Sequence, residues 1–452
     1  MTKLAEAILD RRVRSPNYFQ GRVLTASDLT AERNALLARQ RMLGRAIGHG
    51  IVEGLWVEND QAAATAPAVN ISAGFAINAE GQLLSLEEDQ TLALSEALAD
   101  KDAAAETCLF KPCDPPEIEA VPTGDGFYLL VMSPTSRFEE KAAMSSLQSD
   151  KASPSCGRKW AVPGIAFRLQ SFDPLNVPGM SDTTRDALEH LVVDIPDSAA
   201  LSRLRNLVAH LCFGSEEVST HAADPWAVES GDPLLTGYGT VDYLRGLDVL
   251  TSCDVPLALI YWSGKGLEIV DCWAVRRRPI AGPLSSEWPS LWAHRLRAEN
   301  EARLFQFQDH LASLLSSEPA PSLLEAREHF RFLPAAGLLP LETTTRAGFT
   351  VERFFDGVPR RDPTEFINDE QLRPILDQSW NHQPVDLTEA EMVWLYRPWQ
   401  QDQALAAGGT DRSYVVFTSA HMPPMNLARF DVARWDYSNY ARCDCAGIIQ
   451  GV

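Results

Sequence analysis

Apolar residues recur with a helical period between positions 25 and 48. Leu29, Leu36 and Leu43 stand seven residues apart, and mostly charged or small residues fill the positions between them. This spacing predicts an amphipathic helix with one buried stripe. The segment Thr25-Ala-Ser-Asp28 is typical of a helix N-terminus, and Gly48 suits the left-handed residue that ends a helix. We therefore expect one capped helix that ends within the stretch GRAIGHGIVEGLWV.

Glycines follow this helix at positions 48, 50 and 54. Their spacing, G-x-G-x-x-x-G, is one residue longer than the dinucleotide-binding motif. A helix also precedes the glycines, whereas a phosphate site needs a helix after them. His49 has no second ligand three or four residues away, which disfavours metal binding and leaves a hydrogen-bonded turn histidine. We therefore interpret Gly48, His49, Gly50 and Gly54 as a structural joint between a helix and a sheet.

Short β-rich runs follow this joint and predict small antiparallel sheets. The segments Ala79-Glu80-Gly81 and Ser263-Gly264-Lys265-Gly266 are typical of hairpin turns. The expected strands cover 50–57, 68–72, 75–78, 82–86, 91–94, 127–132, 161–172, both arms of the hairpin around 263–266, 393–396, 414–419 and 429–435.

Helical patterns return in three further segments. They cover 181–213, split by Pro196, then 286–316 and 369–378, and the second of these carries an apolar side formed by Leu304, Phe307, Leu311, Leu314 and Leu315. The predicted class is α+β, with several short antiparallel sheets, a capped N-terminal helix and a long central helix. We expect five regions: a helix and small β module at 1–98, a Pro/Cys linker at 99–126, a mixed α/β region at 127–285, a helical segment at 286–340 and an α+β region at 341–452.

Composition narrows the classes of partner. The chain has 452 residues, with 40 Lys and Arg against 61 Asp and Glu, so its formal net charge is −21. This charge repels a phosphate backbone and argues against nucleic acid as a general partner. The longest apolar run, from Val255 to Trp262, is too short to span a membrane. These features predict a cytoplasmic protein without a membrane-spanning segment.

The eight cysteines are too sparse for a disulfide scaffold and suit a reducing compartment. None forms a C-x-x-C pair, and the close pair Cys443 and Cys445 is a weak zinc signal without a partner pair. We also expect no disulfide between Cys253 and Cys272, because the hairpin places them out of register. No metal and no cofactor is predicted.

Motifs of catalysis are missing from the sequence. Ser263 lacks the leading glycine of a G-x-S-x-G nucleophile turn. Neither Glu189-His190 nor Glu328-His329 has the second histidine of a zinc protease, so both are expected to be exposed pairs on helices. These absences favour a protein that is not an enzyme.

Acidic residues near strand ends keep one alternative open. Asp254, Asp271, Asp431 and Asp436 lie close to tryptophans, as carboxylates do in sugar hydrolases. The alternative hypothesis is therefore a carbohydrate-binding or carbohydrate-active protein. In the C-terminal stretch ARFDVARWDYSNYARCDC, Trp435, Tyr437 and Tyr440 are instead interpreted as interface residues, because aromatic rings supply large contact areas.

Several stretches together resemble one group of bacterial proteins. These are PNYFQGRVLTASDLTAERN, GHGIVEGLWV, NISAGFAINAEGQLLSL, CDVPLALIYW, VDCWAVRRR, RFLPAAGLLPL and ARFDVARWDYSNYA. They resemble proteins encoded with contractile injection systems, the phage-tail-like machines of bacteria. The resemblance implies a structural or accessory subunit, at the baseplate or another fixed position, with tube, sheath or baseplate proteins as partners. Tyr18 and Phe19 lie in the first stretch and are expected at an interface.

Overall fold

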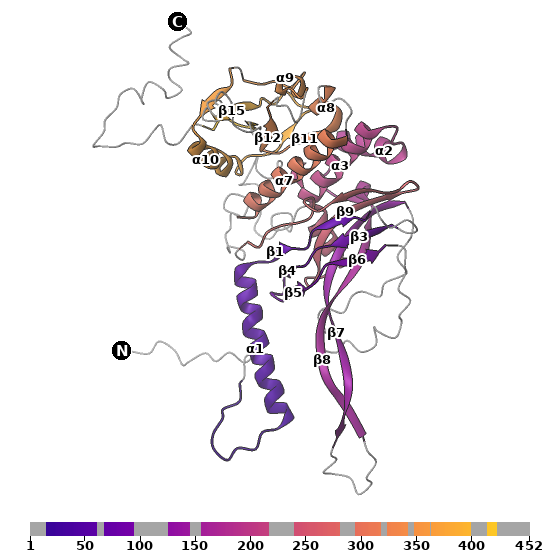
Figure 1. Cartoon of the computed structure of the whole chain (residues 1–452), viewed down its shortest axis with the longest axis vertical. Coiled ribbons are helices and arrows are strands. Elements are labelled where there is room, and N and C mark those ends of the chain that lie inside the picture. The colour runs from indigo at the N-terminus through magenta and orange to yellow at the C-terminus, as the bar shows by residue number, and fades with distance from the viewer. Residues whose placement is uncertain are drawn as a thin grey trace, which may run out of the picture. The chain divides into compact units, whose positions relative to one another are not determined.

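The computed structural model describes residues 15–60, 67–94, 125–144, 155–216, 239–280, 294–317, 323–341, 348–361, 363–398 and 414–422. They belong to two compact units. Unit 1 comprises Met1–Phe172, Leu244–Cys272 and Arg276–Ser285, and unit 2 comprises Asp173–Tyr243, Trp273–Val275 and Ser286–Val452. Each unit combines helices with short, mainly antiparallel sheets, which confirms the predicted α+β class (Figure 1).

Unit 1 begins with helix α1 (Ala26–Ile47). The Thr25 hydroxyl accepts a hydrogen bond from the Asp28 amide, and the Asp28 carboxylate accepts one from the Thr25 amide, so the predicted capping box is present. The helix ends at Gly48, as predicted. Gly48 has φ of 100° and ψ of 164°, so its backbone is extended with positive φ rather than left-handed helical.

Two three-stranded sheets follow α1, in the orders β1-β4-β5 and β2-β3-β6. The single predicted strand over 50–57 is wrong, because Gly54 and Leu55 both have positive φ and divide it between the two sheets. The turn at 79–81 joins β4 to β5 as predicted. The strands are β1 (Gly50–Gly54), β2 (Val57–Asn59), β3 (Ala68–Ile71), β4 (Gly74–Ile77), β5 (Leu83–Leu86) and β6 (Gln90–Ala93).

A third sheet of unit 1 has the order β10-β9-β7-β8. Its strands are β7 (Gly126–Met144), β8 (Ser155–Phe172), β9 (Val255–Ser263) and β10 (Gly266–Asp271), and the β9–β10 hairpin confirms the turn predicted at 263–266. Strand β9 pairs with β7 only over residues 126–132, whereas β8 pairs with β7 along its whole length. Residues 133–144 and 155–166 therefore continue past β9 as a two-stranded ribbon, here called the β ribbon (Figure 1).

The core of unit 1 joins these sheets. Apolar side chains from the two small sheets pack with inward residues of β7 and β9, and they include Ile51, Leu55, Val69, Ile71, Leu130, Met132, Leu257 and Ile260. Because β7 and β9 are central strands, their apolar runs are buried, as the near-continuous hydrophobic pattern of 127–132 and 255–262 predicts.

Unit 2 contains most of the other helices. The segment 181–213 forms two helices that are separated around Pro196, as predicted. The elements are η3 (Pro174–Asn176), α2 (Asp182–Val193), α3 (Ser198–Phe213), α5 (Gly239–Gly246, which begins in unit 2), α7 (His294–Ser317), α8 (Ala326–His329), α9 (Val351–Phe354) and α10 (Asp369–Ser379). Residues 286–293 of the predicted central helix lie outside the described ranges.

The sheets of unit 2 have the orders β12-β16-β15-β13 and β11-β14, and β13 pairs parallel with β15. Their strands are β11 (Phe332–Leu333), β12 (Ala336–Pro340), β13 (Glu365–Ile367), β14 (Val385–Asp386), β15 (Trp394–Pro398) and β16 (Tyr414–Thr418). The predicted apolar side of α7 is confirmed, since Phe307, Leu311 and Leu314 are buried in one core with Phe330 and Phe417. The predicted strand over 429–435 lies outside the described residues.

Candidate functional site

The glycine joint is closely packed in the structure. A Cβ atom on Gly48 would lie 1.5 Å from the carbonyl oxygen of Ile280, and one on Gly54 would lie 1.8 Å from that of Ala73. A Cβ atom on Gly50 would lie 2.5 Å from the carbonyl oxygen of Arg277, and the Ile51 amide donates to that carbonyl at 2.8 Å. Only glycine fits these backbone approaches. His49 is exposed between them.

Arg276 holds the turn between β1 and β2, a role that sequence reasoning missed. Its guanidinium donates to the carbonyls of Gly54 at 2.8 Å and Leu55 at 3.3 Å, and it stacks 3.9 Å from the ring centroid of Trp56. Burial lowers the pKa of Arg276 to about 10, so the side chain stays charged near neutral pH. The basic cluster at 276–278 therefore supports the joint. Arg276 and Gly54 are 222 residues apart in the sequence, so no local motif indicates this contact.

Of the predicted interface residues, the structure describes Tyr18 and Phe19. Tyr18 and Phe19 are exposed, as an interface requires, and the Tyr18 hydroxyl donates to the Glu32 carboxylate on α1. This hydrogen bond is the first cause of a raised pKa of Tyr18. Trp435, Tyr437 and Tyr440 lie outside the described residues, as do Cys443 and Cys445.

The acidic residues of the carbohydrate alternative are not arranged to meet a sugar. Asp254 is buried, and its carboxylate accepts from Ser133 Oγ at 2.5 Å, from an Arg168 guanidinium nitrogen at 2.5 Å and from the Thr251 amide at 2.6 Å. Asp271 is fully buried. Asp431 and Asp436 lie outside the described ranges. Asp254 and Asp271 therefore serve the interior of unit 1, since a glycosidase carboxylate must reach the glycosidic bond.

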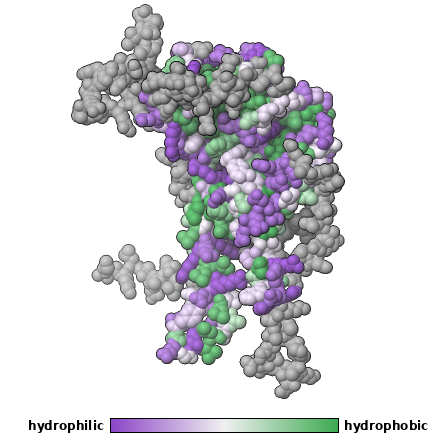
Figure 2. Space-filling model, viewed as in Figure 1, coloured by the Kyte–Doolittle hydropathy of each residue, from purple (hydrophilic) through white to green (hydrophobic). Residues whose placement is uncertain are grey.

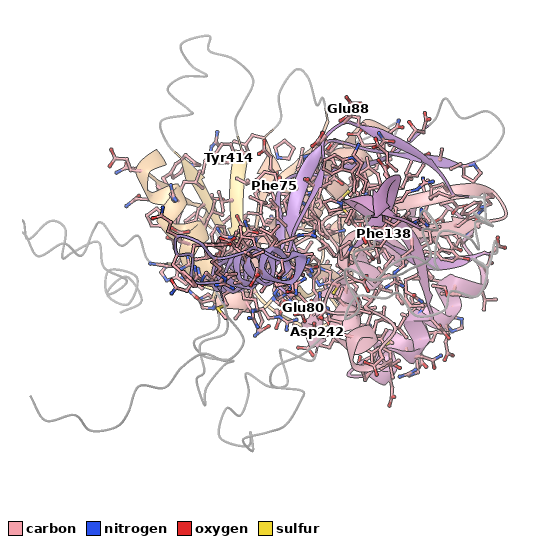
Figure 3. The ribbon with its side chains drawn as sticks, turned by 90° about the horizontal axis from the view of Figure 1, so that it is seen from below. Phe75, Glu80, Glu88, Phe138, Asp242 and Tyr414 are labelled. Atoms are coloured by element: carbon pink, nitrogen blue, oxygen red, sulfur yellow. The ribbon has the colours of Figure 1, made fainter. Side chains whose placement is uncertain are left out.

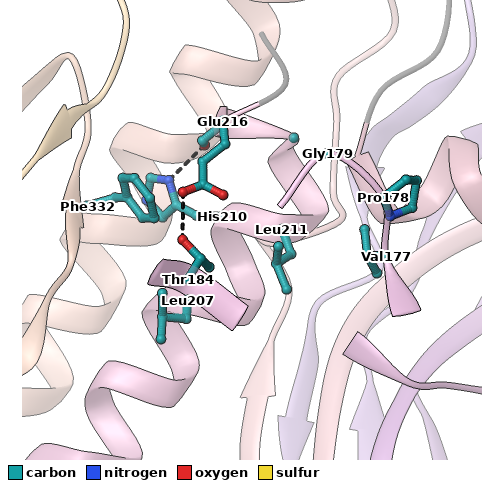
Figure 4. A pocket seen from close by; sticks show the side chains of 11 residues that line it. Val177, Pro178, Gly179, Thr184, Leu207, His210, Leu211, Glu216 and Phe332 are labelled. Atoms are coloured by element: carbon teal, nitrogen blue, oxygen red, sulfur yellow. Dashed lines mark hydrogen bonds between the residues drawn. The ribbon is translucent and has the colours of Figure 1, made fainter. Parts of the chain in front are cut away.

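A polar cluster around Glu216 lines a small cavity in unit 2 (Figure 4). The Glu216 carboxylate accepts from Thr184 Oγ1 at 2.6 Å and from both the amide and the hydroxyl of Ser181 at 2.9 Å. Arg331 lies 3.3 Å from Glu216 and from Asp386, and so links them. The cluster ties the start of α2 to the end of α3 and to the β11–β14 pair.

His210 in the same cluster has the wrong geometry for a serine nucleophile. Its Nδ1 lies 2.8 Å from Ser215 Oγ, whereas a catalytic triad uses Nε2 for the serine and Nδ1 for the acid. The ring stacks on Phe332, and burial followed by the nearby Arg303 charge holds the pKa of His210 well below its ordinary value. The cavity has about 10 Å³ of space, which is room for about one water molecule and not for a substrate.

Two other predictions concern histidine and cysteine. His190 is exposed, but His329 is buried, so the expectation of an exposed Glu328-His329 pair is wrong. Cys272 remains a thiol and is not bridged to Cys253, as predicted, and its Sγ donates to the Val57 carbonyl. Cys253 is disulfide-bonded, which the sparse cysteine count did not predict. Among the described side chains, no group of three or more His, Cys, Asp or Glu is placed to hold a metal ion.

Helix α1 exposes the apolar stripe that the sequence predicted to be buried. Leu29, Leu36 and Leu43 are 55%, 55% and 66% exposed, and Ile47 is 56% exposed. Only Ala35 and Gly44 of this helix are buried, and the Gly44 backbone approaches that of Gly81 in the β4–β5 turn. Figure 2 shows hydrophobic residues at the surface along α1. We call Leu29, Leu36, Leu43 and Ile47 the leucine stripe. The prediction of burial is wrong because no described residue of the chain packs over it.

The β ribbon of unit 1 also carries exposed apolar side chains. Trp160 and Val162, which share one face of β8, are 54% and 40% exposed. They stand opposite Glu139 and Arg137 on β7. Figure 3 labels Phe138, which separates these two residues in the sequence. A two-stranded ribbon is marginally stable by itself, because it lacks further strands or a helix on its faces.

None of the described helices has the length and apolar character needed to cross a membrane.

Comparison with known proteins gave structural neighbours only. No protein-family model matches the chain, and no curated protein matches its sequence. A type VI secretion system baseplate complex contains a chain with 12% identity and a TM-score of 0.24, over 68% of this chain and 71% of that one. A chain of a TssK-TssF-TssG baseplate subcomplex has 11% identity and a TM-score of 0.23, over 68% of this chain and 73% of that one. A crystal structure of TssK has 12% identity and a TM-score of 0.19, over 52% of this chain and 54% of that one. TM-scores this low do not establish a shared fold, and no function follows from them.

Proposed function

We propose that this chain is a structural or accessory subunit of a phage-tail-like contractile injection particle, associated with the baseplate, and that it acts through protein–protein contacts. The kind of particle follows from the sequence stretches that resemble proteins encoded with such systems. The tube, sheath and baseplate proteins are the proposed partners, and the assembled particle lies in the cytoplasm.

One structural observation carries the proposal of a role in assembly. The β ribbon extends past β9, and its Trp160 and Val162 are exposed on one face. Exposed aromatic and β-branched side chains on an isolated ribbon are typical of surfaces that a neighbour covers. Two prolines lie within the ribbon: Pro134 stands opposite Ile165, and Pro163 stands opposite Ser136. Since proline cannot donate to a strand ladder, they oppose uncontrolled pairing along the ribbon edges.

The polar groups of unit 2 agree with a role without catalysis. Glu216 accepts hydrogen bonds from Thr184 and Ser181, and its charge is balanced by Arg331. The adjoining cavity is too small for a metabolite. A cluster of this kind stabilises the packing of α2 and α3, because buried polar groups that are paired rigidify the fold around them.

Affinity purification of the tagged chain from its native cells tests the proposal, with mass spectrometry and negative-stain imaging of the bound material. Tube, sheath and baseplate proteins should co-purify. Trp160→Glu should reduce their recovery, because it places a charge on the exposed face of the ribbon. The matched control is Val193→Glu, at an exposed position on α2 of unit 2, and it should leave recovery unchanged. Purification of a monomer without any tail protein would overturn the proposal.

A further inference from the structure

The edges of the leucine stripe carry an asymmetric set of charges. Along one edge of the stripe, Glu32 lies in the first half of α1 and Arg39 in the second half, whereas Arg41 and Arg45 lie on the opposite face of the helix. Glu32 and Arg39 are seven residues apart, so they flank the same edge of the stripe. The other edge carries Arg33 and Gln40. One edge of the stripe therefore carries an acidic residue in the first half of the helix and a basic residue two turns later.

We propose that α1 pairs antiparallel with α1 of a second copy of this chain, through the leucine stripe. In this arrangement the centre of the pair lies near Leu36, and Glu32 of each copy lies beside Arg39 of the other. Two equivalent ion pairs then flank the buried leucines, one on each side of the two-fold axis. The inference deepens the proposed function by naming the partner of one surface, and it rests on the proposed function only for the particle in which the pair operates.

The charges select the antiparallel arrangement over the parallel one. A parallel pair would place Arg33 against Arg33 of the second copy at the apolar seam, and it would bring Glu32 beside the uncharged Leu37. An antiparallel pair brings Glu32 of one helix beside Arg39 of the other. It also aligns the two helix dipoles in opposite directions, which is the favourable orientation. The surface is therefore complementary to itself.

Contacts within the chain keep this surface available. The capping box fixes the start of α1, and the close approach of Gly44 to Gly81 fixes its end. Both contacts leave Leu29, Leu36 and Leu43 exposed. The Tyr18 hydroxyl donates to Glu32, which holds that carboxylate at the edge of the stripe. Tyr18 and Phe19 are themselves exposed, so they can extend the contact with the second copy.

Sedimentation velocity of the purified full chain, over concentrations on the order of 10⁻⁶ to 10⁻⁴ M, tests the pairing. The wild-type chain should associate to dimers. Glu32→Arg and Arg39→Glu should each raise the dissociation constant about tenfold, because each replaces two ion pairs with two repulsive pairs. The double variant Glu32→Arg/Arg39→Glu should return to within about threefold of wild type. An equimolar mixture of the two single variants should form the mixed dimer.

Two further variants test whether association depends on the leucine stripe or on any exposed leucine. Leu36→Glu should abolish association, and Leu247→Glu should not, although Leu247 is an equally exposed leucine at 54%. Circular dichroism checks that both variants remain folded. The pairing is refuted if the wild-type chain stays monomeric across this range, if the single charge variants associate like wild type, or if the double variant and the mixture fail to recover. The proposed function is tested separately, by whether tail proteins co-purify with the chain. If they co-purify with a chain that stays monomeric, the pairing is refuted and the proposed function stands.

Discussion

Helices α1 and α7 carry the same kind of apolar periodicity but differ in what covers it. In α7, Phe307 and Leu311 are almost fully buried in the phenylalanine-rich core of unit 2. In α1, Leu29 and Leu36 are more than half exposed. Both helices form because the period of their apolar residues suits a helix. The periodicity therefore predicts the helix, but only the rest of the fold, or another chain, determines what buries its stripe.

The largest loss of stability should come from shortening a buried side chain of α7. Phe307→Ala should lower the free energy of unfolding of unit 2 by about 3–5 kcal/mol, because it leaves a cavity among Phe330, Phe354 and Phe417. Urea denaturation followed by circular dichroism measures the loss, with each transition fitted separately. A change below about 1 kcal/mol would mean that the side chain is not in a packed core.

A second test breaks the joint that holds the end of α1. Gly48→Val should destabilise unit 1 by about 3 kcal/mol, because its side chain would meet the Ile280 carbonyl and because positive φ is unfavourable for valine. His49→Ala is the matched control, and it should change stability by less than about 0.5 kcal/mol. Thermal and urea denaturation measure both. If His49→Ala abolished a measured activity of the protein without changing its stability, the interpretation of the joint as purely structural would be contradicted.

The third test uses pH, since the interior of unit 2 holds neutral histidines. Burial is the first cause of the strongly lowered pKa values of His210 and His310; the charge of Arg303 adds to it at His210, and that of Arg205 and the neighbouring His329 at His310. Below the ordinary pKa of 6.5 the unfolded chain binds more protons than the folded one, so stability should fall as pH decreases below 6.5 and stay level above it.

Each histidine that stays neutral in the folded state should lower the free energy of unfolding by about 1.4 kcal/mol at pH 5.5. The slope of stability against pH is the readout, from urea titrations between pH 5.5 and 8. His310→Asn should make this slope shallower, even if it lowers stability at every pH. An unchanged slope would show that His310 gains its proton in the folded state. His49, which is exposed in unit 1, provides the control position.

The smallest effect should come from α1 itself. Leu36→Ala should change the free energy of unfolding of the monomer by less than about 0.5 kcal/mol, because its side chain is more than half exposed and alanine favours helix. Urea denaturation at a concentration below the onset of association measures it. A loss near that of Phe307→Ala would mean that the chain itself covers the stripe.

Sequence reasoning succeeded where the signal lies within a few residues. Thr25 and Asp28 cap α1, Ala79-Glu80-Gly81 and Ser263-Gly264-Lys265-Gly266 form hairpin turns, and Pro196 separates α2 from α3. Each of these features depends on local backbone preferences and hydrogen bonds, which short motifs encode directly.

It failed where the outcome depends on segments distant in sequence. The prediction ended one strand at Met132, whereas β7 continues to Met144 because β8 pairs with it along its whole length. Arg276 and the cluster around Glu216 are assembled from segments that lie far apart in the chain. The exposure of the leucine stripe was missed for the same reason, since an apolar period does not reveal whether its cover belongs to the same chain.

Hydroxyl-radical footprinting of α1 tests most directly the claim that another chain covers this stripe. The measurement compares the purified chain at low concentration with the assembly recovered from native cells. Leu36, Leu43 and the exposed Met42 should be oxidised in the dilute chain and protected in the assembly, whereas Phe307 should be protected in both. Equal oxidation of α1 in the two samples would contradict the account, because the stripe would then remain exposed in the assembly.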